Sequence, residues 1–228
     1  MSVYSGPNTI QNGLVLHIDP SNPRSYPGAG STLFDLSGNG NNGILTGAVF
    51  NSSNGGVISF DGINDYSAHP SMSLDSSLSV SCFARLQGSL FSPGVILSNC
   101  DVLGTSIGFH LEAWTIGPKW GILWGTNPYF RPQASDLIIL NTWYYLCVVR
   151  SGSIGNWNTK FYINSNIVFN INTNINPASN NLVSIGRAGS FNGQYFPGQI
   201  SNISIYNRAL THQEIINNFN ATRGRYGI

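Results

Sequence analysis

The chain has very few charged residues. Asp, Glu, Lys and Arg make up 8% of its 228 residues, whereas an ordinary soluble domain has about 25%. Lys and Arg total ten and form no run, so the electrostatic attraction that drives nucleic-acid binding is missing. Hydrophobic residues still make up 41% of the chain and aromatic residues 12%, which is too apolar for a disordered protein. The composition therefore predicts a folded domain with a nearly neutral surface and no nucleic-acid partner.

Long apolar runs are also missing. No stretch approaches the roughly 20 apolar residues of a membrane-spanning helix, so we expect no membrane insertion. The opening MSVYSGPN has neither the basic nor the apolar region of a secretory signal. No linker-like segment divides the sequence, which predicts a single domain over residues 1–228 with an N-terminal arm at 1–12.

Cysteine is scarce, and the three present give no disulfide framework. Cys82, Cys100 and Cys147 are odd in number and irregularly spaced. Cys82 lies on an alternating apolar row and Cys147 inside an apolar run, so both are predicted to be small buried side chains. Cys100 lies in a polar segment, where we expect exposure. A cysteine–histidine nucleophile is the alternative that the composition leaves open.

What the sequence does contain is a series of short apolar segments between turn-rich ones, which indicates a β-sandwich or barrel. Leu14, Leu16 and Ile18 are expected to face inward from the first strand. Residues 143–149 are apolar on both faces, which is typical of a central strand covered on each side. Asn164 to Asn166 form a predicted hairpin turn. Along residues 107–114, Ile107, Phe109 and Leu111 are expected to point one way and His110, Glu112 and Trp114 the other. The predicted strands are 14–19, 57–60, 78–86, 107–114, 121–124, 143–149, 161–163, 167–171, 182–185 and 200–206, about a dozen with the shorter segments.

The end of the chain carries the one clear helix signal. Thr211 followed three residues later by Glu214 is a capping box, which predicts a helix over residues 211–220. Ile215, Ile216 and Phe219 give that helix one apolar side. Residues 221–228 form a predicted tail.

Five phrases of the sequence, in this order, resemble the laminin-G-like, concanavalin A-like jelly-roll modules. They are GLVLHID at 13–19, DLSGNGNNG at 35–43, ISFDGINDY at 58–66, NTWY to FYIN at 141–164, and IYNRALTxxE at 205–214. The resemblance implies an all-β fold, a two-sheet antiparallel jelly-roll sandwich with one short C-terminal helix. It also implies a binding or structural module, often directed at carbohydrate. Residues 219–227 are similar to the endings of such modules in tailed-phage virion proteins.

The same fold also carries glycosidases, but their signature is missing. Retaining hydrolysis needs two carboxyl groups about 5–5.5 Å apart, which on one strand face means acidic residues at alternate positions. The only glutamates are Glu112 and Glu214, and neither has a second carboxylate within four residues. Glu214 is already explained by the capping box. No nucleophile elbow is present either, so we expect no enzyme.

A cluster of aromatic and polar residues is the candidate sugar site. Sugar C–H faces stack on aromatic rings, while sugar hydroxyl groups need amide and carboxylate partners. We expect a carbohydrate-binding groove to be lined by Trp114, Trp120, Trp124, Tyr129, His110, Glu112 and Asn127. The alternative is that the tryptophans lie in the core or in a subunit interface, where aromatic residues are also enriched.

Two Gly- and Asn-rich loops are the candidate metal sites. No cofactor is required, and calcium is the metal that fits best, because it prefers carboxylate and carbonyl oxygen ligands. The candidate calcium ligands are Asp35 and Asn39 in one loop and Asp61, Asn64 and Asp65 in the other. The alternative is that these side chains bind their own backbone, as Asp and Asn commonly do in turns. The four histidines have no metal-ligand spacing.

The sequence thus leads to two hypotheses. The first is a non-enzymatic virion structural module, a capsid decoration or tail-associated protein of a tailed phage, made in the host cytoplasm and located in the virion. Its partners would be other virion proteins and further copies of itself, as a homo-oligomer, with a cell-surface glycan as a ligand. The alternative is a lectin-like carbohydrate-binding module of a larger or secreted protein.

Overall fold

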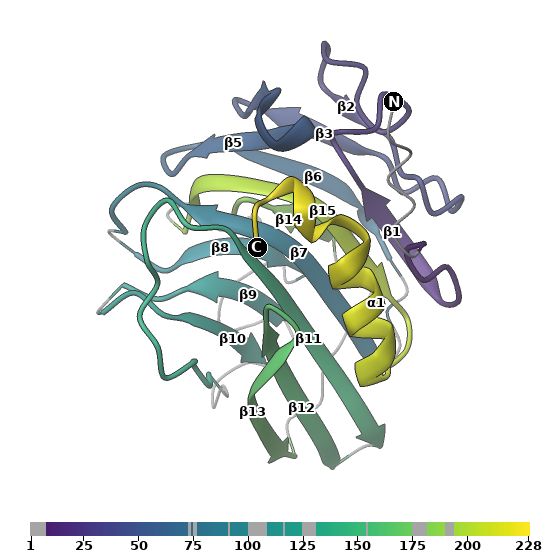
Figure 1. Cartoon of the computed structure of the whole chain (residues 1–228), viewed down its shortest axis with the longest axis vertical. Helices are drawn as coiled ribbons and strands as arrows, with labels where there is room; N and C mark the ends of the chain where they lie inside the picture. Colours follow the sequence, from purple (N-terminus) through teal and green to yellow (C-terminus); the bar gives the residue numbers. More distant parts are fainter. Residues whose placement is uncertain are drawn as a thin grey trace.

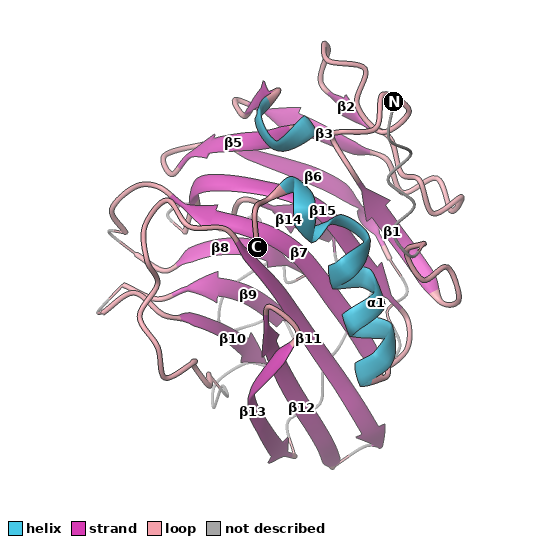
Figure 2. Ribbon diagram, viewed as in Figure 1, coloured by secondary structure: helices cyan, strands magenta, loops and turns pink. Residues whose placement is uncertain are grey.

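The computed structural model is a sandwich of two antiparallel sheets with one α-helix (Figures 1 and 2). It describes residues 8–72, 74, 77–90, 92–99, 109–115, 117–124, 131–153, 155–174, 182–189 and 194–228. The predicted all-β class with two sheets and a short C-terminal helix is confirmed. The described residues form fifteen strands, where the sequence predicted about a dozen. None of the helices in the described part of the chain has the length and apolarity needed to cross a membrane.

Sheet A has the order β13-β12-β11-β7-β15-β5-β4, and β1 also pairs with β15. Its strands are β1 (Leu14–Ile18), β4 (Val49–Asn51), β5 (Val57–Asp61), β7 (Leu78–Leu86), β11 (Tyr144–Ser153), β12 (Asn156–Ile163), β13 (Asn166–Thr173) and β15 (Pro197–Tyr206). A short 3-10 helix, η1 (Ser53–Gly55), connects β4 to β5.

Sheet B has the order β10-β9-β8-β14-β6-β3-β2. Its strands are β2 (Thr32–Leu33), β3 (Gly43–Thr46), β6 (Tyr66–Ser71), β8 (Gly94–Ser98), β9 (Phe109–Ala113), β10 (Trp120–Trp124) and β14 (Leu182–Ile185). Of the predicted strand at 107–114, residues 109–113 form β9, and residues 107 and 108 lie outside the described residues.

The two clearest sequence patterns produce the two layers of core. On β7 the alternating row Leu78, Val80, Cys82, Ala84 and Leu86 faces the space between the sheets. The neighbouring strand β11 is apolar on both faces, as predicted. Its Leu146 and Val148 enter the core between the sheets, while its Tyr145, Cys147 and Val149 face the opposite side. Burial of both cysteines, Cys82 and Cys147, is confirmed, whereas Cys100 lies outside the described residues.

That opposite side of sheet A is covered by the end of the chain. Helix α1 (His212–Thr222) is followed by the 3-10 helix η2 (Arg223–Arg225), and Figure 1 shows α1 lying across sheet A. Phe219 packs against Phe83 of β7 and Tyr145 of β11. Tyr226 stacks on Phe83 with ring centroids 4.0 Å apart. Both faces of sheet A are thus occupied, one by the core and one by α1 and the tail.

Two local predictions are confirmed at the level of backbone geometry. The capping box is complete, because the Thr211 side chain accepts from the Glu214 amide and the Glu214 carboxylate accepts from the Thr211 amide. Helix α1 extends two residues beyond the predicted end at 220. The β12–β13 hairpin turns through Asn164 and Ser165, which both have positive φ (50° and 66°), as a type I′ turn requires.

The prediction for the first strand was wrong at one residue. Leu16 and Ile18 enter the core between the sheets, but Leu14 packs on the helix side of sheet A. The pairing of β1 with β15 shifts register between Leu14 and Leu16. A bulge of this kind inserts an extra residue and turns the following side chain to the other face.

Candidate functional site

The outer face of sheet B, directed away from the core, is the face of the sandwich that α1 and the tail do not cover. Its strands pair in a register that places Ala68, Ser184, Ser98 and His110 in one row. The residues next to them in sequence, such as Leu97, Leu111 and Ile185, face the core. The row is therefore polar and buried on β14, β8 and β9, whereas the other side of the same strands is apolar.

Glu112, Arg131 and Trp114 form a compact cluster on this face. The Glu112 carboxylate accepts two hydrogen bonds from the Arg131 guanidinium, 2.6 Å from Nε to Oε1 and 2.9 Å from Nη2 to Oε2. The guanidinium carbon lies 3.9 Å from the centroid of the Trp114 ring. Glu112 is almost fully buried, while the Arg131 side chain is 14% exposed. The arginine is thus fixed from both sides, by charge and by stacking.

Arg131 reaches this position because the chain segment after β10 runs back along that strand. The Ile122 amide donates to the Pro132 carbonyl, and the Ala134 amide donates to the Trp120 carbonyl. Gly121 permits this close approach, since a Cβ atom at that position would lie 2.9 Å from the Pro132 oxygen. Gly121 is also the residue paired with Glu112.

His110 lies beside the cluster and is uncharged at neutral pH. Its Nδ1 is 3.9 Å from Oε2 of Glu112. Complete burial, and secondarily the charge of Arg131, lower the pKa of His110 to about 3. Burial raises the pKa of the Glu112 carboxyl, and the hydrogen bonds and charge of Arg131 oppose that shift.

A second arginine stacks on an aromatic ring on the same face. The guanidinium carbon of Arg187 lies 3.4 Å from the centroid of the Tyr66 ring. The backbone around Arg187 is fixed by Ser98, whose hydroxyl donates to the Arg187 carbonyl (3.0 Å) and accepts from the Gly189 amide (2.7 Å). Residues 187–189 therefore fold over the middle of the outer face.

The structure brings together three of the seven predicted sugar-site residues. His110, Glu112 and Trp114 are neighbours on the outer face or at its margin, as their alternation in the sequence predicted. For Trp120 the prediction was wrong, because its side chain is 1% exposed and packs in the core near Tyr144 and Phe196. The Trp124 side chain, Asn127 and Tyr129 lie outside the described residues.

Sequence reasoning missed the two arginines. Arg131 is 19 residues from Glu112, and Arg187 is far from Tyr66 in the chain. No local spacing connects either pair. The general preference of arginine for aromatic faces was the one available signal, and it does not select a partner.

The candidate calcium ligands shape their own loops. The Asp35 carboxylate accepts from the amides of His17, Ser37 and Asn41, and the Asn39 amide group donates to the Leu14 carbonyl. The other loop is tied by bonds from the Ile63 and Asn64 amides to Asp61 and from the Asp61 amide to Asp65. In the described ranges no three His, Cys, Asp or Glu side chains gather as a metal site would require. Calcium binding stays a prediction.

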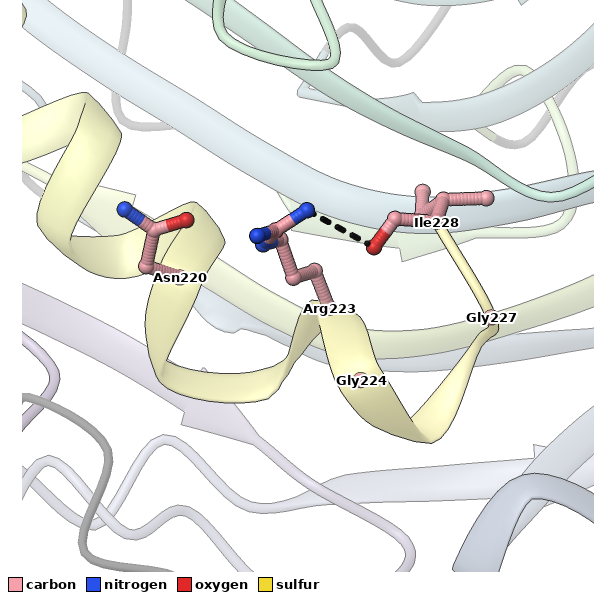
Figure 3. A pocket seen from close by; sticks show the side chains of 5 residues that line it. All are labelled: Asn220, Arg223, Gly224, Gly227 and Ile228. Carbon is pink, nitrogen blue, oxygen red and sulfur yellow. Dashed lines mark hydrogen bonds between the residues drawn. The ribbon is translucent and has the colours of Figure 1, made fainter.

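The pocket drawn in Figure 3 lies at the end of the chain and has a volume of about 440 Å³. It is lined by Asn220, Arg223, Gly224, Gly227 and Ile228, and Arg223 donates to the Ile228 main-chain oxygen (3.3 Å). No aromatic ring is among these lining residues. The pocket thus lacks the stacking platform that the outer face of sheet B provides.

Both glutamates of the chain are held by arginines. Glu112 pairs with Arg131, and Glu214 pairs with Arg208 through two hydrogen bonds of 2.9 and 2.6 Å. The hydrogen bond from Arg208 lowers the pKa of Glu214 to about 2. A glycosidase acid needs a raised pKa and a second carboxylate nearby. Glu214 has the opposite shift, and it serves the helix cap.

A two-sheet sandwich with a polar, aromatic-flanked outer face is the arrangement of lectin-like modules. The family model of the concanavalin A-like lectin/glucanase superfamily matches residues 60–216, and the chain belongs to that superfamily. No curated protein sequence matches the chain at a significant level.

Several solved structures share the fold. Domain 4 of AbnA, a GH43 extracellular arabinanase from Geobacillus stearothermophilus solved in complex with arabinotriose, has a TM-score of 0.70 and 18% identity, covering 90% of this chain and 97% of that one. The binding domain of Paraclostridial Mosquitocidal Protein 1 has a TM-score of 0.67 and 16% identity over 92% of this chain. The receptor-binding domain of botulinum neurotoxin D has a TM-score of 0.69 and 14% identity over 92% of this chain. The chain spans about half the length of the two toxin domains, 52% and 53%.

Proposed function

We propose that this protein is a non-enzymatic carbohydrate-binding module whose ligand lies on the outer face of sheet B. The observation that carries the proposal is the cluster of Trp114, Arg131 and Glu112. It places a half-buried indole ring against a fixed arginine–glutamate pair, at the end of β9 on the outer face. An aromatic ring with a few fixed polar groups is the usual composition of a small-ligand site. The sugar-binding superfamily and the arabinotriose complex of AbnA domain 4 support the same function.

The salt bridge gives Trp114 a fixed position. Arg131 is tied to the nearly buried Glu112 and stacks on one face of the indole. A ring held in place before binding loses little conformational freedom when a ligand stacks on it. Arg131 and Glu112 therefore act as positioning residues, and Trp114 is the residue that would contact the sugar.

The first test is binding to a broad glycan array, with calcium present, by the parent protein and by Trp114→Ala. We expect saturable binding by the parent and a loss of about thirtyfold in affinity for the variant, which corresponds to about 2 kcal/mol for a buried aromatic contact. Phe34→Ala is the matched control, because Phe34 is an exposed aromatic residue (42%) beside β2, at the far edge of the same sheet. An array without a hit, or equal binding by the Trp114 variant, would overturn the proposal.

A second candidate function is a structural module of a tailed-phage virion, as a capsid decoration or tail-associated protein. The observation that favours it is the similarity of residues 219–227 to endings of modules in such proteins, together with the low charge of the chain. In this role the protein would occur in the particle as a homo-oligomer in contact with other virion proteins, and it could still bind a surface glycan. Mass spectrometry of purified particles tests the role, and absence of the protein from the particle would contradict it.

A further inference from the structure

Arg187 carries a positive charge on the outer face of sheet B that no carboxylate balances in the described part of the chain. Elsewhere among the described residues, three arginines each form an ion pair: Arg131 with Glu112, Arg208 with Glu214 and Arg225 with Asp19. Arg187 forms none, and its buried Nε has no hydrogen-bond partner among the described residues. The buried Nε is closed to solvent, but Arg187 as a residue is half-buried rather than buried, so an anionic ligand would pair with the terminal nitrogens of the guanidinium.

The guanidinium of Arg187 is fixed in place before any ligand binds. Tyr66 supports one of its planar faces at 3.4 Å, and Ser98 binds the main chain at the Arg187 carbonyl and at the Gly189 amide. The guanidinium is a rigid fork of donors that matches the two oxygens of a carboxylate or of a sulfate. Stacking leaves the edge of the guanidinium as the direction from which an anion can approach.

Arg187 and the Trp114 cluster lie at the same level of the sheet. Ala68 on β6 and His110 on β9 belong to one row. Because β6 and β9 run in opposite directions, Tyr66, two residues before Ala68, and Glu112, two residues after His110, lie on the same side of that row. Strands β14 and β8 separate β6 from β9. Three strand spacings correspond to roughly 14 Å. An oligosaccharide of a few sugar rings can span this distance across the face.

We infer that the glycan is acidic, with a carboxylate or sulfate group that binds Arg187 while another sugar ring stacks on Trp114. This inference rests on the proposed function and specifies its ligand class. The two arginines have different roles. Arg131 is neutralised by Glu112 and positions the indole ring, whereas Arg187 keeps its charge for the ligand. A neutral glycan would leave that charge without a partner.

The experiment uses an array in which each neutral oligosaccharide is paired with its uronic-acid form and its sulfated form. The parent protein is compared with Arg187→Gln, which removes the charge, and with Arg187→Lys, which keeps the charge but loses the planar fork. Arg223→Gln is the matched control, since it removes the same charge beside the pocket of Figure 3, on the helix side. Titration of the best acidic and neutral pair at low and high NaCl completes the test.

We expect the parent to prefer an acidic member of a pair, and Arg187→Gln to lose roughly tenfold or more of the affinity for that member only. Arg187→Lys should fall between them, Arg223→Gln should match the parent, and salt should weaken the acidic ligand alone. The uronic and sulfated arms identify the anionic group. Equal binding of neutral and acidic members, or an unchanged preference in Arg187→Gln, overturns the inference but leaves the proposed function intact. An array with no hit at all removes the proposed function and the inference with it.

Discussion

Three of the four histidines are held neutral by burial, and each for a visible structural reason. His69 faces the core, where the ring occupies the space left by Gly43, whose Cβ would lie 2.3 Å from the ring carbon. The His69 Nδ1 must donate to the Asn41 carbonyl, so Nε2 accepts from the Ser67 hydroxyl. Burial lowers the pKa of His17, His69 and His110.

These shifts predict that acid weakens the fold before its carboxylates titrate. Each histidine has a pKa below the unfolded value of about 6.5, so the unfolded state binds more protons as the pH falls through that value. The free energy of unfolding should fall between pH 7 and pH 5, by up to about 1.4 kcal/mol per pH unit for each histidine. Urea unfolding at several pH values measures this slope.

The variant His69→Asn removes one titrating group and keeps a donor for the Asn41 carbonyl. We expect a smaller dependence of the unfolding free energy on pH, whatever its absolute stability. Gln213→Asn, at the exposed start of α1, changes no titrating group, so it is the matched control and should keep the parent slope. A stability that is constant from pH 7 to pH 5 in the parent would contradict the interpretation.

Among the elements, α1 is the one whose boundary rests on a defined pair of side chains. Thr211→Ala removes the acceptor for the Glu214 amide and should lower the free energy of unfolding by about 1 kcal/mol. Thr211→Ser keeps the oxygen and should stay near the parent. The midpoint of urea unfolding is expected to shift without a change in its slope, and equal midpoints for the Ala and Ser variants would show that the cap contributes nothing.

The strands and turns also show which structural features a local sequence pattern can predict. Alternation predicted the core row of β7, the two-sided burial of β11 and the β12–β13 turn, because each depends on neighbouring residues in one strand or turn. The bulge at Leu14 depends on pairing with Tyr206, nearly the whole chain away, and a local pattern cannot contain it.

In the candidate site, too, local patterns predicted some residues and missed those that depend on distant contacts. Trp114 and Glu112 share an alternating row that the sequence displays, whereas Arg131 reaches them only after a loop returns along β10. Trp120 lies two residues before Ile122 and therefore on the same face of the strand, and both are in the core. The alternation within this strand already indicated that Trp120 is buried.

At the scale of the whole molecule, the tail is bound to the segments that follow β1 and β4. Arg225 pairs with Asp19 after β1 through two hydrogen bonds of 2.9 Å, and its carbonyl accepts from the Asn54 side chain. Tyr226 fills the space between Phe83 and Trp143. The last residues therefore complete the second core rather than extend from it.

Removing that ring should destabilise the entire domain. Tyr226→Ala is expected to lower the free energy of unfolding by about 3–5 kcal/mol, as for other large buried aromatic residues. Arg223→Gln, in the same tail but exposed, should change it by less than about 0.5 kcal/mol. Denaturant unfolding followed by tryptophan fluorescence measures both, and a loss below about 1 kcal/mol for Tyr226→Ala would mean that the tail is dispensable.

The position of the chain ends decides how the protein should be immobilised for any binding assay. Ile10 and Ile228 both pack against the core on the helix side of sheet A, and the Ile10 amide donates to Asn218 of α1. A biotin attached at Ile228 would direct the outer face of sheet B toward the solution. Chemical coupling through amines would do the reverse for the molecules attached at Lys119, one of the two lysines, because the Lys119 carbonyl accepts from the Trp114 amide. Molecules held in that way would hide the ring that the sensor is meant to probe.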